Sequence, residues 1–355
     1  MTDTKKSCLT MDKMWQRHCP SPETVTLSEM ACAYDGLVAC LTQRDQPLVI
    51  KQLVSEWPLV QAARMGNESL CEYLLKYDRG AVVDAIRLPA SADGRMFYND
   101  DMNGFNFTRA KMPFKNALAA LLSQQHDAMA DTLYVGSTTV DTCLPGLLET
   151  NKIALASLNP LGTLWIGNKS RIAAHYDAPD NLICVASGKR RVTLFPPSQT
   201  KNLYVGPLHF TPAGQAISMV DFSEPDLKQY PRFERAIEHA LVVELLPGDA
   251  LYIPSMWWHH IEGTESINLL INYWWRDVPA YIGRSENVLY HALLTLKQLP
   301  EPQREAWRAL FDFYVFDSDG ARFNHIPLSK QGPLGELDEN TVRQFKAWLV
   351  NNLKH

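Results

Sequence analysis

Residues that bind divalent metal ions stand at two places in the second half of the chain. A His-x-Asp pair is formed by His175 and Asp177, and two adjacent histidines, His259 and His260, follow later. Two histidines and one carboxylate in this order are the ligand set of a facial triad, which holds Fe(II) and leaves one face of the ion open. We therefore expect the functional site within residues 171–275.

Strand geometry decides how these side chains can meet. Because side chains alternate along a strand, His175 and Asp177 point to the same face and can reach one metal ion. Adjacent His259 and His260 point to opposite faces, so only one of them can complete the set, and strand geometry alone leaves open which. In a chain with ten histidines a single His-x-Asp pair is a weak signal. We expect the remaining imidazole to be satisfied by hydrogen bonds near the barrel mouth.

A series of short strands is predicted around these residues. Their expected positions are 163–167, 171–175, 181–186, 190–195, 241–245, 250–253, 257–261 and 267–274. Many short strands at fairly even spacing favour a β-sandwich or barrel. Because the first ligand pair lies on an early strand and the last ligand on a late one, a jelly roll is needed to bring them together.

Elements of mixed type are predicted on both sides of this barrel. Helices are expected at 27–41, 57–65, 69–77 and 113–124, with strands at 47–50, 81–88, 95–99 and 132–136. A capping box from Ser69 to Glu72 is expected to start the third helix. Further helices are expected at 278–299, 301–314 and 338–353. The predicted fold is mainly β with α: an N-terminal α/β cover (1–130), a double-stranded β-helix of the jelly-roll type (131–276) and a C-terminal helical segment (277–355).

Composition limits the class of protein. The 355 residues are 46% hydrophobic and 21% charged, which is typical of a globular protein with a sizeable core. The net charge of −5 gives no global positive field for nucleic acid or an anionic membrane. Seven cysteines without a CxxC pair predict reduced thiols and a cytoplasmic location. Residues 1–20 have no apolar segment of the kind found in signal peptides, and no apolar run reaches the roughly 20 residues that span a bilayer.

Four motifs in this order resemble the cupin-like JmjC hydroxylases, in particular the branch that contains the asparaginyl hydroxylase inhibiting hypoxia-inducible factor. The motifs are His175–Asp177, Gly188–Pro197, Gly248–Pro254 and Trp257–His260. Residues 220–226 and 230–233 also resemble an insert between barrel strands in that branch. The resemblance covers residues 134–274 with firm motifs, and it extends more weakly into the N-terminal half at 47–50, 57–58 and 97–100.

The resemblance implies an Fe(II)- and 2-oxoglutarate-dependent oxygenase, a hydroxylase that releases succinate and CO2. In that family the first histidine of the Trp-Trp-His element is the ligand, which selects His259 over His260. Two imidazoles and a carboxylate leave three positions on the iron, two for 2-oxoglutarate and one for O2. The far carboxylate of 2-oxoglutarate then needs a cation and hydrogen-bond donors in an otherwise dry pocket.

Arg190 is the candidate cation for that carboxylate. On its strand it shares a face with Val192 and Leu194, so it is expected to point into the barrel while Arg191 points out. The family more often has Lys here, and the longer, forked guanidinium is not a neutral exchange. The alternative is that residues 189–191 form a solvated basic turn.

The resemblance assigns four further residues to the 2-oxoglutarate pocket. Tyr134 matches a carboxylate-binding tyrosine, Asn181 and Asn272 match pocket amides, and Trp274 matches the aromatic residue that closes the site. Each could instead be an ordinary core or backbone-bonded residue. Ile172 stands where the close relative has a threonine, so one hydroxyl donor to the co-substrate is missing.

Substrate and assembly are expectations from the family. It favours a protein side chain presented on an extended segment; a tRNA base and a small molecule stay open, and the acidic balance counts slightly against RNA. A homodimer through the C-terminal helices is expected, with apolar positions at Leu289, Leu293, Leu294 and Leu296. Two other classes stay open: a cupin that binds a metal for redox-neutral chemistry without 2-oxoglutarate, and a catalytically silent barrel. The intact ligand set argues against the silent barrel.

Overall fold

The structure is a computed structural model that describes residues 19–26, 28–30, 35–212, 214–317, 319 and 321–353. Residues 1–18 lie outside this set, as do residues 27 and 31–34 of the helix expected at 27–41. A single helix over 27–41 is wrong, because Gly36 adopts a φ of 92° and a separate helix, α3 (Leu37–Thr42), begins after it. The chain divides into two compact units, residues 1–276 and 277–355.

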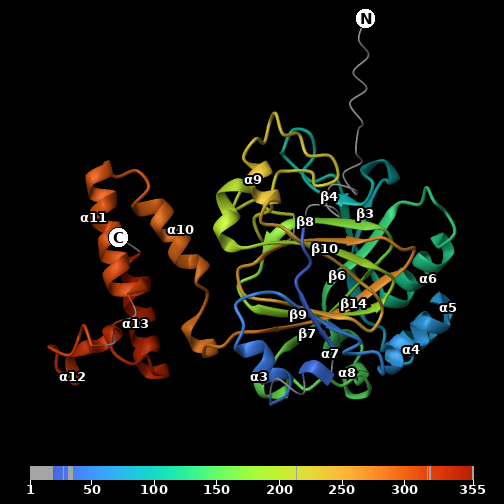
Figure 1. The fold of residues 1–355 in the computed structure, drawn as a ribbon, viewed down its shortest axis with the longest axis horizontal. Helices are drawn as coiled ribbons and strands as arrows, with labels where there is room; N and C mark the ends of the chain where they lie inside the picture. The colour runs from blue at the N-terminus through green and yellow to red at the C-terminus, as the bar shows by residue number, and fades with distance from the viewer. Residues whose placement is uncertain are drawn as a thin grey trace, which may run out of the picture. The chain divides into compact units, whose positions relative to one another are not determined.

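Two sheets build the first unit (Figure 1). The larger sheet has nine strands, which are, in spatial order, β1 (Glu23–Thr26), β2 (Leu48–Lys51), β12 (Ala250–Ile253), β9 (Asp180–Ser187), β14 (Asn268–Trp275), β7 (Leu161–Gly167), β6 (Thr132–Thr139), β3 (Val82–Leu88) and β5 (Thr108–Pro113). The smaller sheet has five strands, in the order β11 (Leu241–Leu245), β10 (Arg190–Phe195), β13 (Trp258–Gly263), β8 (Ser170–Tyr176) and β4 (Arg95–Met96). Neighbouring strands are antiparallel except in the β1–β2 and β4–β8 pairs.

The eight strands β7 to β14 form the predicted jelly roll. Strands β7, β9, β12 and β14 belong to the larger sheet, whereas β8, β10, β11 and β13 belong to the smaller one, so the chain winds between the two. Each of them lies within two residues of its expected bounds, and β10, β11 and β12 begin and end as predicted. The fold class is therefore confirmed: a mixed α/β protein built on a cupin-type sandwich, followed by C-terminal helices.

Segments before residue 140 extend and cover the larger sheet. Strands β2, β3, β5 and β6 add to its two ends, and the helices α4 (Pro58–Met65), α5 (Asn67–Leu75) and α6 (Phe114–Gln124) pack on it (Figure 1). Their apolar faces carry Leu59, Leu70 and Leu118, which are buried in one cluster with Leu182 and Ile271 of the sheet. At roughly 25 cal/mol per Å2 of buried apolar area, this burial is the main force holding the cover to the barrel.

Three local predictions differ from the structure. Helix α5 begins at Asn67 after Gly66, whose φ of 136° few other residues adopt, so Ser69 lies inside the helix and the capping box is wrong. Strand β4 is two residues long rather than five. Strand β5 was not expected, because Thr108 to Lys111 are all exposed and show no apolar face; its pairing with β3 holds it in place.

The second unit contains α10 (Glu286–Thr295), α11 (Glu301–Phe311), α12 (Leu328–Gln331) and α13 (Glu339–Asn352). The single helix expected at 278–299 is wrong in extent, because Gly283 adopts a φ of 98° and ends a short 3-10 turn before α10 starts. Helix α13 begins as predicted at Asp338, whose carboxylate accepts the Thr341 backbone N–H. Within the described residues, no helix is both long enough and apolar enough to cross a bilayer.

Candidate active site

Three side chains that can bind a metal ion meet between the two sheets. Strand β8 carries His175, Asp177 follows it directly, and β13 carries His259. Because β8 and β13 pair with His175 opposite His259, the two imidazoles lie side by side, with ring centroids 4.4 Å apart. One ligand atom from each residue lies within 4.8 Å of the other two. These atoms can therefore surround a single ion.

Backbone hydrogen bonds set the tautomer of both imidazoles. The Nδ1 atom of His175 lies 2.9 Å from the Ala173 carbonyl oxygen, and Nδ1 of His259 lies 3.0 Å from that of Trp257. A carbonyl oxygen can only accept, so each Nδ1 carries the proton and each Nε2 keeps its lone pair for a metal. Metal-binding histidines in proteins usually make such a hydrogen bond through the ring nitrogen that does not bind the metal.

The protonation states of two of these residues also suit a metal ligand. Burial and, to a smaller extent, the adjacent His259 imidazole lower the pKa of His175 to about 4. Burial by itself raises the pKa of Asp177, but the adjacent His259, together with His175 and the Trp274 indole N–H, holds it below its usual range. Near neutral pH, His175 is therefore neutral and Asp177 is ionised, which are the forms that bind metals.

Trp274 fixes the orientation of the carboxylate. Its indole Nε1 donates a hydrogen bond of 3.2 Å to Oδ2 of Asp177, the oxygen that lies 3.5 Å from Nε2 of His259. This contact was not predicted from the sequence, in which Trp274 was expected only to close the pocket. The residue lies on β14, so both sheets hold Asp177 in place.

His260 lies on the other face of β13. Its Nε2 is 3.1 Å from Oε1 of Glu262, and its ring packs against Phe222 with centroids 4.9 Å apart. Among the described residues its Nδ1 has no partner. The alternation of strand side chains thus places His259, and not His260, beside His175.

One cavity of about 610 Å3 lies around the three ligand side chains. The residues lining it include all eight that the sequence singled out: Tyr134, His175, Asp177, Asn181, Arg190, His259, Asn272 and Trp274. They come from β6, β8, β9, β10, β13 and β14 and from the residue that follows β8. Ile172 lines the same cavity and offers no hydrogen-bond donor from its side chain.

Arg190 lies deep in this cavity, and none of the described residues forms an ion pair with it. Only 1% of its surface is exposed, and its Nε and Nη2 atoms have no hydrogen-bond partner within the described part of the chain. The predicted alternation is observed, because Val192 and Leu194 are also buried, whereas Arg191 faces Glu244 and Glu262 on the outer side. A buried cation without an anion is unfavourable by several kcal/mol. The site therefore suits an anionic ligand that reaches Arg190.

Two neighbours of Arg190 shape its surroundings: Gly263 leaves room for the guanidinium, and Tyr134 adds a hydrogen-bond donor. Gly263 on the paired strand is close enough that a Cβ there would lie 3.0 Å from Arg190 Nη1. Burial raises the pKa of Tyr134 to about 12, so its phenol stays protonated and can donate. Burial lowers the pKa of Arg190, with Tyr134 opposing this effect. The guanidinium and the phenol together match the needs of one carboxylate.

Asn181 and Asn272 belong to a hydrogen-bond network with Trp165, a residue that the sequence analysis did not assign to the site. Asn272 donates through Nδ2 to Oδ1 of Asn181 at 3.0 Å, and its own Oδ1 accepts from Nε1 of Trp165 at 2.6 Å. The Thr163 hydroxyl also donates to that oxygen. Trp165 contacts Trp274 edge to face, with ring centroids 5.8 Å apart. The two amides therefore fix the aromatic wall of the cavity.

The outer part of the cavity was also missed. It is lined by residues from two loops and an edge strand: Phe105, Phe107, Arg109, Thr211, Pro212, Gln215 and Ile217. Phe105 and Phe107 stack with centroids 5.1 Å apart, and Arg109 donates to the Pro212 carbonyl. Two phenylalanines spaced by one residue were the one available signal, and loops carry no periodic pattern that would place them.

Comparisons with known proteins agree with this architecture. A sequence profile of the cupin-like domain family matches residues 36–281. Lysine-specific demethylase JMJ31 of Arabidopsis thaliana is 34% identical over 125 residues, 35% of this chain and 22% of that protein. HSPB1-associated protein 1 of Homo sapiens is 34% identical over 149 residues, 41% of this chain and 30% of that protein. tRNA wybutosine-synthesizing protein 5 of Homo sapiens is 29% identical over 158 residues, 40% of this chain and 47% of that protein. The chain thus matches less than half the length of each relative.

Proposed function

Because this chain belongs to the cupin-like domain family, we propose that it is an Fe(II)- and 2-oxoglutarate-dependent oxygenase that hydroxylates its substrate. The buried guanidinium of Arg190 carries the proposal, because two of its nitrogen atoms have no partner among the described residues and it lies in the same cavity as His175, Asp177 and His259. A metal-binding cupin without an acidic co-substrate has no use for a buried cation at that depth. The family and the sequence motifs support the same reading.

The donor set fits Fe(II). Two imidazoles with free Nε2 atoms and one carboxylate bind it without closing its coordination sphere. His175, His259 and Asp177 would hold the ion. When bound, the ion would supply the activation of O2 for oxidative decarboxylation of 2-oxoglutarate to succinate and CO2 and for hydroxylation of a substrate C–H bond, with one oxygen atom of O2 entering succinate and the other entering the hydroxylated substrate.

The chain's own residues prepare the site for this reaction. Arg190 and Tyr134 bind the far carboxylate of 2-oxoglutarate, the first through its charge and the second through its hydroxyl. Trp274 keeps the Asp177 carboxylate turned toward the imidazoles. Apolar side chains, which include Ile183 and Ile261, line the cavity and keep water from the reacting atoms.

We propose a protein side chain as the substrate. Strand β5, the last strand of the larger sheet, contributes Arg109 to the lining of the cavity, and among the described strands it pairs only with β3. Its other edge offers backbone groups to which an extended polypeptide can add as a further strand. Arg109 of β5 and Phe107, the residue just before β5, line the cavity. One relative is named a lysine-specific demethylase and another a tRNA wybutosine-synthesizing protein, and the net charge of −5 counts against RNA here.

The test is a product assay with separate substrate pools. Purified protein is given Fe(II), 2-oxoglutarate and O2 with a peptide pool, a tRNA pool or a metabolite pool. We expect succinate release with the peptide pool and a peptide heavier by one oxygen atom, and no succinate from the Asp177→Ala variant. Stimulation by tRNA alone would refute the substrate class. Iron binding without succinate from any pool would refute the oxygenase and favour redox-neutral chemistry.

We propose in addition that the second unit forms a homodimer. Helices α10 and α11 contain no buried residue, and their exposed apolar side chains include Leu289 (45%), Leu294 (77%) and Trp307 (44%). Apolar helix faces of this kind are stable in water when another surface covers them. A second copy of the same helices offers a self-complementary cover.

A further inference from the structure

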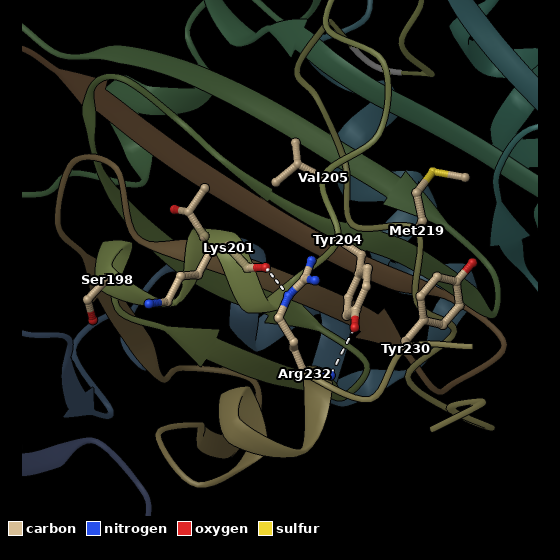
Figure 2. Close-up of a pocket in the computed structure, with 8 residues that line it drawn as sticks. Ser198, Lys201, Tyr204, Val205, Met219, Tyr230 and Arg232 are labelled. Carbon is tan, nitrogen blue, oxygen red and sulfur yellow. Dashed lines mark hydrogen bonds between the residues drawn. The ribbon is translucent and has the colours of Figure 1, made fainter. Parts of the chain in front are cut away.

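A second concave site lies on the outside of the smaller sheet, away from the metal ligands. It has a volume of about 760 Å3, and its lining includes Ser198, Lys201, Tyr204, Met219, Tyr230 and Arg232 (Figure 2). Its floor touches the back of β13, because the Thr200 hydroxyl accepts a hydrogen bond of 2.9 Å from Nε1 of Trp258. The family resemblance assigns no role to the residues of this site, and the proposed oxygenase reaction does not involve them.

Arg232 is held ready in this concavity. Its Nε donates to the Lys201 carbonyl at 3.1 Å, and its guanidinium lies over the Tyr204 ring at 4.3 Å from the centroid. Its backbone N–H donates to the Tyr204 hydroxyl at 2.9 Å, so the same tyrosine holds both the backbone and the guanidinium of Arg232. Figure 2 shows Arg232 between Lys201 and Tyr204. Ordering the guanidinium in advance reduces the entropy lost when a ligand binds to its Nη atoms.

The charge of this site is of one sign. Lys201 and Arg232 are both exposed cations, and none of the described residues lining the site is Asp or Glu. The whole chain carries a net charge of −5, whereas the lining of this site contains two cations and no described anion. A phosphate monoester carries about 1.5 to 2 negative charges near pH 7 and three acceptor oxygens, whereas a single carboxylate carries one charge. The Ser198 hydroxyl also lines the site, and a lining with two cations and a hydroxyl matches the phosphate better.

The site is also larger than a phosphate ion, and its far side is aromatic and apolar. Tyr204 and Tyr230 meet edge to face with ring centroids 4.9 Å apart, and Met219 and Val205 border them (Figure 2). A planar or apolar group attached to the phosphate can pack against these side chains. We propose that this site binds a small-molecule phosphate monoester, with its phosphate at Lys201 and Arg232 and its body against the two tyrosines.

The test is calorimetric titration of the full-length protein with adenosine 5′-monophosphate, inorganic phosphate and adenosine. We expect the nucleotide to bind more tightly than phosphate and adenosine not to bind. Losing one charged donor should weaken nucleotide binding about tenfold in both Arg232→Gln and Lys201→Gln. Arg235→Gln, which removes a nearby exposed cation outside the site, should bind the nucleotide like the unchanged protein.

Several results would overturn the proposal. Nucleotide binding that survives Arg232→Gln and disappears in Arg190→Met would place the anion in the inner cavity. Equal affinity for adenosine and its monophosphate would show that the site does not recognise phosphate. Equal affinity for inorganic phosphate and the nucleotide would refute the role of the tyrosines. A protein that binds none of the three has no such site. Because no step uses iron or 2-oxoglutarate, these outcomes are independent of the oxygenase activity.

Discussion

Replacing Arg190 by methionine should keep or raise the stability of the ligand-free protein and weaken its binding of 2-oxoglutarate. In the absence of ligand the guanidinium is buried with two nitrogen atoms that have no partner among the described residues. Methionine fills a similar volume without a charge, and such exchanges of buried ionic groups stabilise proteins by about 1–4 kcal/mol or leave them unchanged. For a domain of this size, each kcal/mol raises the melting temperature by about 2–4 °C.

Affinity for 2-oxoglutarate should fall at the same time. Truncating one partner of a buried, hydrogen-bonded charge pair costs about 2–5 kcal/mol. At about 1.4 kcal/mol per factor of ten, the dissociation constant should rise on the order of 30- to 4000-fold. The assays are thermal unfolding of the metal-free protein and titration of the Mn(II)-loaded protein with 2-oxoglutarate. Mn(II) binds to the same donor set without redox turnover.

Arg191→Met is the matched control, because that side chain faces Glu244 and Glu262 outside the cavity. It should leave 2-oxoglutarate binding within about twofold, and any loss of stability should be under about 1 kcal/mol, as for a surface ion pair. The reasoning fails if Arg190→Met binds 2-oxoglutarate like the unchanged protein. It also fails if that variant is strongly destabilised without ligand, since Arg190 would then be a structural residue with partners of its own.

Three further predictions concern the metal ligands, the residue that orients them, and assembly. Asp177→Ala should abolish succinate formation, whereas His260→Ala should keep turnover per folded molecule within about threefold. The His260→Ala variant should also lose about 1–3 kcal/mol of stability, because Glu262 loses its buried hydrogen-bond partner. If His260→Ala abolished turnover and Asp177→Ala did not, the choice of ligands would be wrong. Trp274→Phe removes the N–H donor to Asp177 and should weaken Mn(II) binding about 10- to 100-fold in a metal titration, and an unchanged affinity would show that this hydrogen bond does not orient the carboxylate. Leu294→Asp should convert a dimer to a monomer in analytical ultracentrifugation, while a monomeric unchanged protein would refute the dimer.

The three candidate metal ligands could be found in the sequence because strand alternation narrowed the choice and the family resemblance selected His259 over His260. His175 and Asp177 had to share a face, and the opposite faces of His259 and His260 meant that only one could join them. The same rule placed Arg190 inside the barrel and Arg191 outside it. Bounds of the barrel strands were also predictable, because buried strands are short apolar runs between turn residues.

Features that depend on tertiary contacts could not be read in the same way. Strand β5 has no apolar face and exists because β3 supplies its hydrogen bonds, so its local sequence gives no strand signal. The hydrogen bond from Trp274 to Asp177 joins residues of two different sheets, and no spacing rule predicts it. The outer site at Arg232 depends on loops that approach one another only in the folded chain.

Anaerobic absorption spectroscopy of the protein with Fe(II) and 2-oxoglutarate tests the central claim most directly. A keto acid chelated to iron gives a weak visible charge-transfer band. We predict this band for the unchanged protein, its absence in Asp177→Ala, and its appearance in Arg190→Met only at much higher 2-oxoglutarate concentration. Iron binding with no band at any concentration of 2-oxoglutarate would contradict the assignment of this cavity to an oxygenase.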